Sequence, residues 1–103
     1  MQIACVRWFN FAHPKIWIYH SPNGGFRNKF EAARFKKMGV RPGVADLCLL
    51  YDGTAHFFEL KSKDGRLTAE QKAFGEYCLA NGFSWVIIRS FDEFKETVER
   101  ILK

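Results

Sequence analysis

Two carboxylates and a lysine are spaced so that they could act together on one surface. Asp46 comes directly before an apolar run, and Glu59 and Lys61 come directly after another. Asp52-Gly53, between the two runs, is a strong signal for a two-residue β-hairpin turn. Such a turn would place Asp46 opposite Glu59, with Cβ atoms roughly 5 Å apart. Lys61 would share that face, because side chains alternate along a strand.

The pairing of Asp46 with Glu59 calls for a compensating charge, because like charges directly opposite each other destabilise a sheet. A divalent cation, the Lys61 ammonium or a shared proton could supply it. Carboxylate oxygens at this separation suit Mg²⁺ or Mn²⁺, and a lysine beside the ion could orient a water or stabilise charge on a phosphate. The alternative is a solvated cross-strand ion pair. The apolar flanks argue against it, because buried charges are costly unless they coordinate or catalyse.

The elements that would position these residues follow from periodicity and turn residues. The sequence predicts helices at about 2–11, 28–38, 68–80 and from 90 onwards, and strands at about 16–19, 46–51, 54–61 and 84–88. This order predicts an α/β (α+β) domain in which helices flank a mixed β-sheet. A single domain is expected to span residues 1–103.

Apolar stripes predict which side of each helix faces the core. They comprise Cys5, Trp8 and Phe9; Phe30, Ala33 and Met38; Leu67, Phe74, Tyr77 and Cys78; and Phe91, Phe94, Val98 and Ile101. Two of the helices begin with capping-box spacing, at Thr68-x-x-Gln71 and Ser90-x-x-Glu93.

Composition indicates a basic globular chain. The formal net charge is +5 and 48% of residues are apolar. A basic surface attracts polyanions, of which nucleic acid is the commonest. The three cysteines form no CxxC pair and are expected to be buried thiols. With no signal peptide and no apolar run of membrane-spanning length, a cytoplasmic location is expected.

Four short blocks follow one another at compact spacing: His20-Ser-Pro-Asn-Gly-Gly25, Gly39-Val-Arg-Pro-Gly-Val-Ala-Asp46, Glu59-Leu-Lys61 and Gly65-Arg-Leu-Thr-x-x-Gln71. Together they resemble the VRR-NUC family of the PD-(D/E)XK nuclease superfamily. The resemblance implies a restriction-endonuclease-like core and Mg²⁺- or Mn²⁺-dependent hydrolysis of DNA phosphodiesters. Stand-alone members, often from phages or prophages, are thought to act as homodimers on branched DNA such as four-way (Holliday) junctions.

The same resemblance implies roles for individual residues. Asp46 and Glu59 would bind the metal together with the backbone carbonyl of Leu60, and Lys61 would position the attacking water. Family members often carry a glutamate on the first helix, a few residues before a glutamine resembling Gln2. This chain begins too late to contain it, which puts a second metal in doubt or requires a substitute.

Glu31 could reach the site from its helix and replace that carboxylate, and Gln71, at the start of its helix, could hold the metal-bound water or Lys61. Each has a structural alternative, because Asn28-x-x-Glu31 and Thr68-x-x-Gln71 have the spacing of a helix cap. The superfamily pattern Gln-x-x-x-Tyr is not met, because Gly75 stands in place of the tyrosine.

Candidate DNA contacts lie on both sides of the carboxylates. His20, Asn23 and Arg27 flank a Gly-Gly turn whose backbone could approach a phosphate. A plain loop is the alternative. Further cations that could neutralise phosphates, or be ordinary solvated charges, are Arg41, Lys63 and Arg66, whereas Arg34, Lys36 and Lys37 are expected on a solvated face. A DNA-binding module without turnover, and a purely structural dimer, remain competing interpretations.

Overall fold

The computed structural model describes residues 1–22 and 28–103, and its elements follow the predicted order. Asn23 and Arg27, two of the predicted DNA contacts, lie outside the described residues. The elements are α1 (Gln2–Ala12), β1 (Trp17–His20), α2 (Lys29–Lys37), β2 (Leu47–Tyr51), β3 (Thr54–Leu60), α3 (Ala69–Ala80), β4 (Ser84–Ile88) and α4 (Phe91–Ile101).

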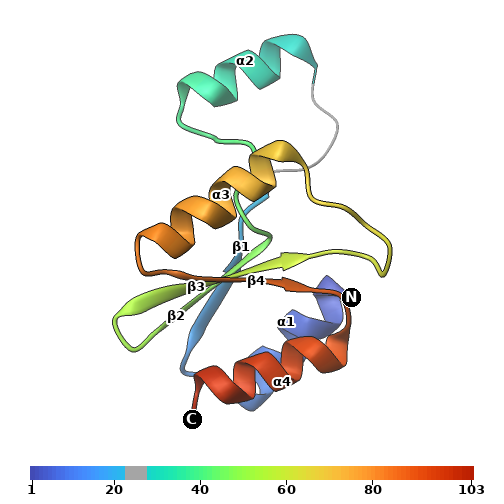
Figure 1. The fold of residues 1–103 in the computed structure, drawn as a ribbon, viewed down its shortest axis with the longest axis vertical. Helices are drawn as coiled ribbons and strands as arrows, with labels where there is room; N and C mark the ends of the chain where they lie inside the picture. Colours follow the sequence, from blue (N-terminus) through green and yellow to red (C-terminus); the bar gives the residue numbers. More distant parts are fainter. Residues whose placement is uncertain (23–27) are drawn as a thin grey trace.

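The four strands form one mixed sheet in the order β1-β2-β3-β4. The first three are antiparallel neighbours, and β4 runs parallel to β3. Helices α1 and α4 cover one face of the sheet and α3 lies on the other (Figure 1). The predicted class, a mixed sheet flanked by helices, is confirmed.

The β2–β3 hairpin has the predicted turn and register. Asp52 and Gly53 have φ angles of 53° and 75°, as a two-residue turn of the left-handed kind requires. Tyr51 consequently pairs with Thr54, and the ladder runs back to the pair Leu47 and Phe58.

The main core lies between the sheet and the α1–α4 pair. Its fully buried members are Cys5, Phe9, Leu47, Leu49, Phe58, Ile88, Phe94 and Val98. The predicted stripes of α1 and α4 supply the helical half of this core, because Trp8, Phe91 and Ile101 pack against it. The three cysteines are buried free thiols, as expected.

Helix α3 packs on the opposite face through aromatic side chains. Phe74 meets Phe57 edge to face at 5.0 Å between ring centroids. Gly75 lies directly over Trp85, where an added Cβ would stand 2.7 Å from the nearest ring atoms. A tyrosine cannot occupy position 75, because even its first side-chain carbon would collide with the indole.

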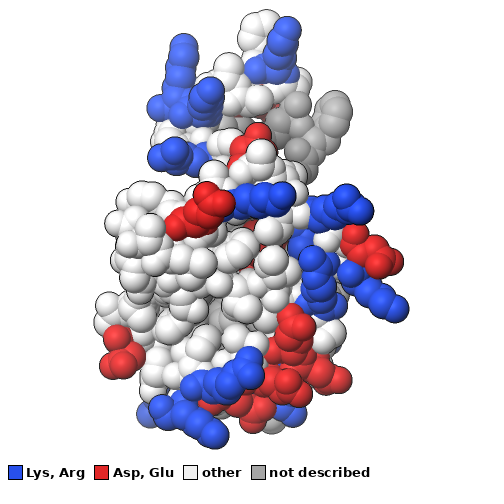
Figure 2. All heavy atoms as spheres, in the orientation of Figure 1, with Lys and Arg blue, Asp and Glu red and all other residues white. Residues whose placement is uncertain are grey.

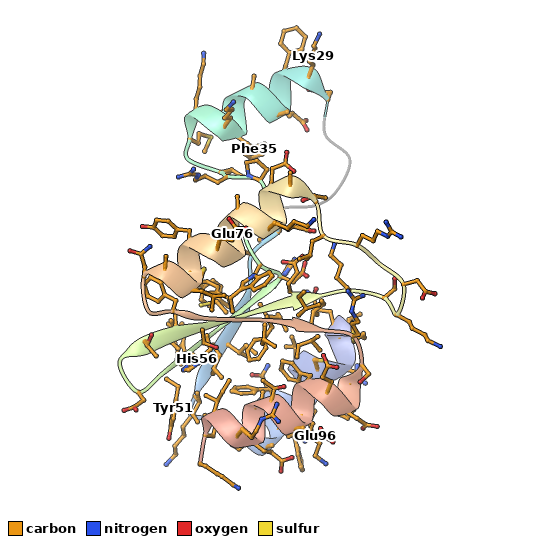
Figure 3. All side chains as sticks on the ribbon, viewed as in Figure 1. Lys29, Phe35, Tyr51, His56, Glu76 and Glu96 are labelled. Carbon is orange, nitrogen blue, oxygen red and sulfur yellow. The ribbon has the colours of Figure 1, made fainter. Side chains whose placement is uncertain are left out.

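The predicted inner face of α2 is wrong. Phe30 and Met38 are 89% and 67% exposed, Ala33 is exposed too, and no residue of the helix is buried. The helix stands apart from the sheet, and its half-buried Phe35 lies on the side toward α3 (Figures 1 and 3). The α3 stripe is also narrower than predicted, because Tyr77 is 65% exposed.

The helices are short, between 9 and 12 residues each. Within residues 1–22 and 28–103, no helix combines the length and the apolar character needed to cross a bilayer. The N-termini of α3 and α4 are capped as predicted, by the side chains of Thr68 and Ser90.

Candidate active site

Asp46 and Glu59 lie one residue beyond the Leu47–Phe58 pair, at the open end of the hairpin. The register predicted from the turn therefore holds up to these two residues. Leu47 and Phe58 point into the core beneath α1 and α4, so alternation directs the two carboxylates to the α3 face. The Asp46 Oδ2 atom accepts a hydrogen bond from the Leu60 backbone N–H at 2.7 Å, which ties the end of one strand to the other.

The Glu59 carboxyl is the most unusual polar group of the fold. The residue is 1% exposed, and its Oε2 atom has no hydrogen-bond partner among the described residues. The pKa of Glu59 is raised to about 7, mainly by burial and secondly by the neighbouring Asp46 carboxylate, while the Lys61 ammonium opposes both. Such a buried oxygen is costly unless a proton or a cation satisfies it.

The Leu60 carbonyl points to the same side as these carboxylates. In an extended strand the N–H and C=O of one residue point toward the same neighbouring strand. The Leu60 N–H points to Asp46, whereas the next N–H, that of Lys61, points the other way and donates to Ile88 O at 2.9 Å. The predicted third oxygen ligand is therefore oriented toward the carboxylates.

This donor set fits a hard divalent cation. No cluster of three or more His, Cys, Asp or Glu side chains suited to a metal occurs within the described part of the chain. Two carboxylates and one carbonyl leave coordination positions for water, and Mg²⁺ characteristically keeps several waters. The Glu59 Oε2 atom, buried and without a donor, is the oxygen that such an ion would satisfy.

Lys61 is held by the loop that follows it. Its half-buried side chain passes Gly65, where an added Cβ would lie 3.5 Å from the lysine Cδ atom. Arg89, at the end of β4, fixes this loop: its Nη1 atom donates to the carbonyls of Ser62 and Gly65, both at 2.8 Å, and of Lys63 at 3.3 Å. Arg89 was not predictable from the sequence, because its partners are backbone carbonyls distant along the chain.

His20 supports the backbone of Asp46. The ring Nδ1 atom lies 2.8 Å from the Asp46 carbonyl oxygen, which also accepts from Ser21 N–H at 3.1 Å. Because a carbonyl can only accept, the imidazole proton belongs on Nδ1, which leaves Nε2 of the exposed ring facing outward for another contact. The predicted phosphate contact of His20 stays a prediction, beside a positioning contact that the sequence did not indicate.

Gly43 joins the approach to Asp46 to the first turn of α3. Its φ angle is +92°, and an added Cβ would stand 2.4 Å from the Glu70 carbonyl oxygen. Only glycine tolerates both the conformation and the proximity. The start of α3 and the Asp46 strand are therefore positioned against each other by backbone contact.

Gln71 and Glu31 both take part in helix caps. The Gln71 Oε1 atom accepts from Thr68 N–H at 2.9 Å, and the Thr68 hydroxyl accepts from Gln71 N–H at 3.1 Å. Asn28 Oδ1 accepts from Glu31 N–H at 2.8 Å, and the Glu31 side chain is exposed on α2. Hence the capping alternative describes the side-chain contact of Gln71, whereas Glu31 takes part in its cap through the backbone N–H, and the site roles of both residues stay predictions.

Arg41, Lys63 and Arg66 are exposed on two sides of the carboxylates. Arg41 lies in the connector before Gly43, and the other two lie in the loop that Arg89 fixes. This placement is compatible with the predicted phosphate contacts and does not test them.

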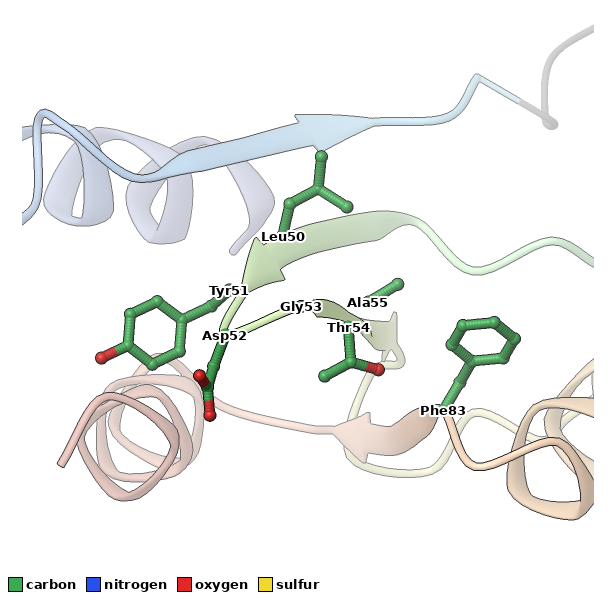
Figure 4. A pocket seen from close by; sticks show the side chains of 7 residues that line it. All are labelled: Leu50, Tyr51, Asp52, Gly53, Thr54, Ala55 and Phe83. Carbon is green, nitrogen blue, oxygen red and sulfur yellow. The ribbon is translucent and has the colours of Figure 1, made fainter.

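A shallow depression lies at the other end of the hairpin (Figure 4). It is lined by Leu50, Tyr51, Asp52, Gly53, Thr54, Ala55 and Phe83. Five strand residues separate this turn from Asp46, about 17 Å at the usual rise of an extended chain. The depression is thus separate from the carboxylate pair.

A solved structure described as a "VRR_NUC domain protein" has a similar fold, with a TM-score of 0.77 and 24% sequence identity. The match covers 96% of this chain and 82% of that one. No protein-family model matches the sequence, and no curated protein matches it. At this identity the likeness establishes the architecture, and the predicted family fold is confirmed. The chain therefore has the fold of this VRR_NUC domain protein.

Proposed function

We propose that this protein is a Mg²⁺- or Mn²⁺-dependent nuclease that hydrolyses DNA phosphodiester bonds. The observation that carries the proposal is the buried Glu59 Oε2 atom, which lacks a donor and lies beside Asp46 on a nuclease-type fold. A purely structural carboxylate in this position would be expected to have a hydrogen-bond donor.

Each residue of the site has a separate task in this proposal. The Asp46 and Glu59 carboxylates and the Leu60 carbonyl would hold the cation. Such an ion supplies a Lewis acid and an activated water for attack on phosphorus. The Lys61 ammonium attracts the scissile phosphate and stabilises the negative charge that develops on its oxygens.

The surrounding contacts keep these groups in place. The Leu60 N–H and His20 fix the side chain and backbone of Asp46, respectively. Arg89 fixes the loop against which Lys61 lies. Such preorganisation is worth most where charge develops during the reaction.

Cleavage of labelled DNA tests the proposal. A four-way junction and a linear duplex are incubated with Mg²⁺, Mn²⁺ or EDTA, using wild type, Asp46→Asn, Glu59→Gln and Lys61→Met. Each substitution is expected to lower the rate by about 10²–10³-fold. Asp64→Asn, which removes an exposed carboxylate from the neighbouring loop, serves as the matched control and is expected to cut normally. Equal rates for wild type and Asp46→Asn would overturn the assignment, and metal-independent binding without cutting would favour the DNA-binding module.

Direct Mn²⁺ binding provides a readout besides activity. Wild type and Asp64→Asn are expected to bind Mn²⁺ equally in an electron paramagnetic resonance titration. Asp46→Asn and Glu59→Gln are expected to bind it at least 10-fold more weakly, because each loses an anionic ligand.

A homodimer acting on branched DNA is the finer form of the proposal. It is supported by the sheet surface that α3 leaves uncovered, where Trp17 is 74% exposed and its pairing partner Leu50 is 47% exposed. Tyr19 on the same face is 46% exposed. A second copy of this chain would bury these side chains. Sedimentation velocity is expected to show a dimer that Trp17→Lys converts to a monomer, and a monomeric wild type would contradict the proposal.

A further inference from the structure

The charges of α2 are arranged on one side of the helix. Successive helical residues are about 100° apart, so Lys29, Arg34, Lys36 and Lys37 fall within an arc of roughly 160° centred opposite Phe35. All four are exposed. The acidic residue of the helix, Glu31, lies on the Phe35 side instead. The charged residues on the outward half of α2, which also holds Phe30 and Ala33, are therefore all basic.

Figure 3 shows this orientation: Lys29 points away from the molecule, and Phe35 lies between α2 and α3. Figure 2 shows Lys and Arg side chains gathered over α2 at one end of the molecule. Acidic and basic side chains lie side by side at the opposite end, where α4 carries Asp92, Glu93, Glu96 and Glu99 as well as Lys95 and Arg100.

The basic face has no role in the packing of the fold. None of the residues of α2 is buried, and the helix stands clear of the sheet. Three of the four cations, Arg34, Lys36 and Lys37, lie in the last turn of α2, where the helix dipole favours positive charge. The dipole accounts for their place along the helix, and their gathering on its outward side also suits a partner with negative charge.

Both ends of the α2 segment are attached at the candidate active site. Before α2, the chain passes His20 and Ser21, which both contact the Asp46 carbonyl. After α2, it passes Arg41 and then Gly43, which rests on the first turn of α3. The helix therefore projects from the rim of the site.

We propose that α2 is a docking arm that binds the phosphates of double-stranded DNA flanking the scissile bond. The inference rests on the proposed function, because it takes DNA as the substrate. The helix rises about 12 Å from Lys29 to Lys37. Over that length one strand of a duplex presents three or four phosphates, at about 3.4 Å each. Four cations on one face match this number.

Fluorescence anisotropy of a labelled 20-base-pair duplex tests the arm, with EDTA present so that no cutting occurs. The arm variant carries Lys29→Gln, Arg34→Gln, Lys36→Gln and Lys37→Gln. The matched control carries Arg7→Gln, Lys15→Gln, Lys95→Gln and Lys103→Gln, which remove four exposed cations from the end of the molecule formed by α1 and α4. Both variants have the same net charge, and a variant with arginine in place of the three α2 lysines keeps the arm basic.

The arm variant is expected to bind at least 10-fold more weakly. Its plot of log affinity against log salt is expected to be shallower by about 2–4 units, because each phosphate contact contributes about 0.9. The control and the arginine variant are expected to keep the wild-type slope. Equal losses of DNA affinity in the arm and control variants would overturn the proposal that α2 is a docking arm.

The two proposals fail in different ways. A wild type that never cuts DNA but whose binding depends on the arm would contradict the nuclease and support the arm. A wild type that cuts DNA, with arm and control variants binding alike, would contradict only the arm.

Discussion

At the scale of single residues, Glu59 is the carboxyl group of the site whose ionisation is costly. Its pKa is raised from 4.5 to about 7, first by burial and then by the Asp46 carboxylate. Between these two values the folded state holds a proton that the unfolded state has released. Stability therefore falls as pH rises from 4.5 to 7 and changes little further above it, as far as this group is concerned.

Glu59→Gln is expected to remove this dependence. At pH 8 it should raise the free energy of unfolding by about 2–3 kcal/mol, since each pKa unit corresponds to roughly 1.4 kcal/mol. Urea unfolding at pH 4.5 and at pH 8 measures the difference. The exposed Glu96→Gln is the control and should leave the pH dependence intact. Parallel pH profiles for Glu59→Gln and wild type would contradict the prediction.

At Gly75, the packing of the helix determines whether an alanine stabilises or destabilises the fold. At an exposed helical position, Gly→Ala stabilises by up to about 1 kcal/mol. Here the added Cβ would stand 2.7 Å from the Trp85 ring, so the indole or the helix must move. Gly75→Ala is expected to destabilise by about 1–3 kcal/mol net, a loss of several degrees in Tm. A raised Tm would show that α3 is not seated on Trp85, and Glu76→Ala, its exposed neighbour, provides the baseline.

The central residues were predictable from sequence because one short turn determines their register. Asp52-Gly53 fixes the pairing of the strands, and counting back along them leads to Asp46 and Glu59, each one residue beyond the final pair, Leu47 and Phe58. The contributions of His20 and Arg89 were not predictable, because both donate to backbone carbonyls of residues more than 20 positions away. A carbonyl is present at every residue, so the sequence contains no signal for such partners.

At the scale of elements, the connector between α2 and β2 determines where Asp46 lies. Gly39 and Gly43 both have positive φ, at 100° and 92°, but only Gly43 is close to other atoms, the Glu70 backbone. Gly39→Ala is expected to cost about 1 kcal/mol from backbone strain alone. Gly43→Ala is expected to cost at least 2 kcal/mol more and to lower cleavage, because α3 and the Asp46 strand can no longer dock.

Thermal unfolding and cleavage rates of these two alanine variants measure this difference. Similar losses of Tm in both would mean that strain, and not docking on Glu70, accounts for the effect. Unchanged cleavage by a folded Gly43→Ala protein would show that Asp46 keeps its place without the contact.

Variants of the α3 capping box distinguish a capping role of Gln71 from a direct role in the site. Thr68→Ala and Gln71→Ala remove its two reciprocal hydrogen bonds, and each is expected to cost about 1 kcal/mol. If Gln71 acts through the cap alone, both variants keep the same cleavage rate below their Tm. A loss of cleavage of 10-fold or more in Gln71→Ala, with Thr68→Ala unaffected, would assign Gln71 a direct role in the site.

The elements themselves follow closely from local signals in the sequence. The Thr68 and Ser90 caps begin the helices as predicted, and the alternation of apolar residues gives the strands. The predicted inner face of α2 was wrong for a physical reason: Phe30 and Met38 supply apolar area, but both stay exposed because no element within residues 1–22 and 28–103 covers them. Apolar periodicity shows which side of a helix could be buried and does not show whether anything covers it.

At the scale of the whole molecule, one face of the sheet holds the main apolar core and the other holds the candidate active site. The α1–α4 side forms the continuous apolar core, whereas the α3 side combines aromatic packing with the carboxylate pair. A carboxylate can be kept buried without a partner only where the rest of the fold supplies enough stability. The large core on the opposite face provides that reserve.

The uneven charge of the two ends, basic at α2 and nearly balanced around α4, gives the molecule an electric dipole along its long axis. In the field of a polyanion, a dipole experiences a torque as well as an attraction, so the protein rotates while it diffuses. It would meet a duplex with α2 leading and with α4 turned away. The rim of the candidate active site would then face the DNA before any contact forms, which shortens the orientational search. Because the Debye length is about 8 Å at physiological ionic strength, this pre-alignment acts only over the last few ångströms of approach and fades as salt is added.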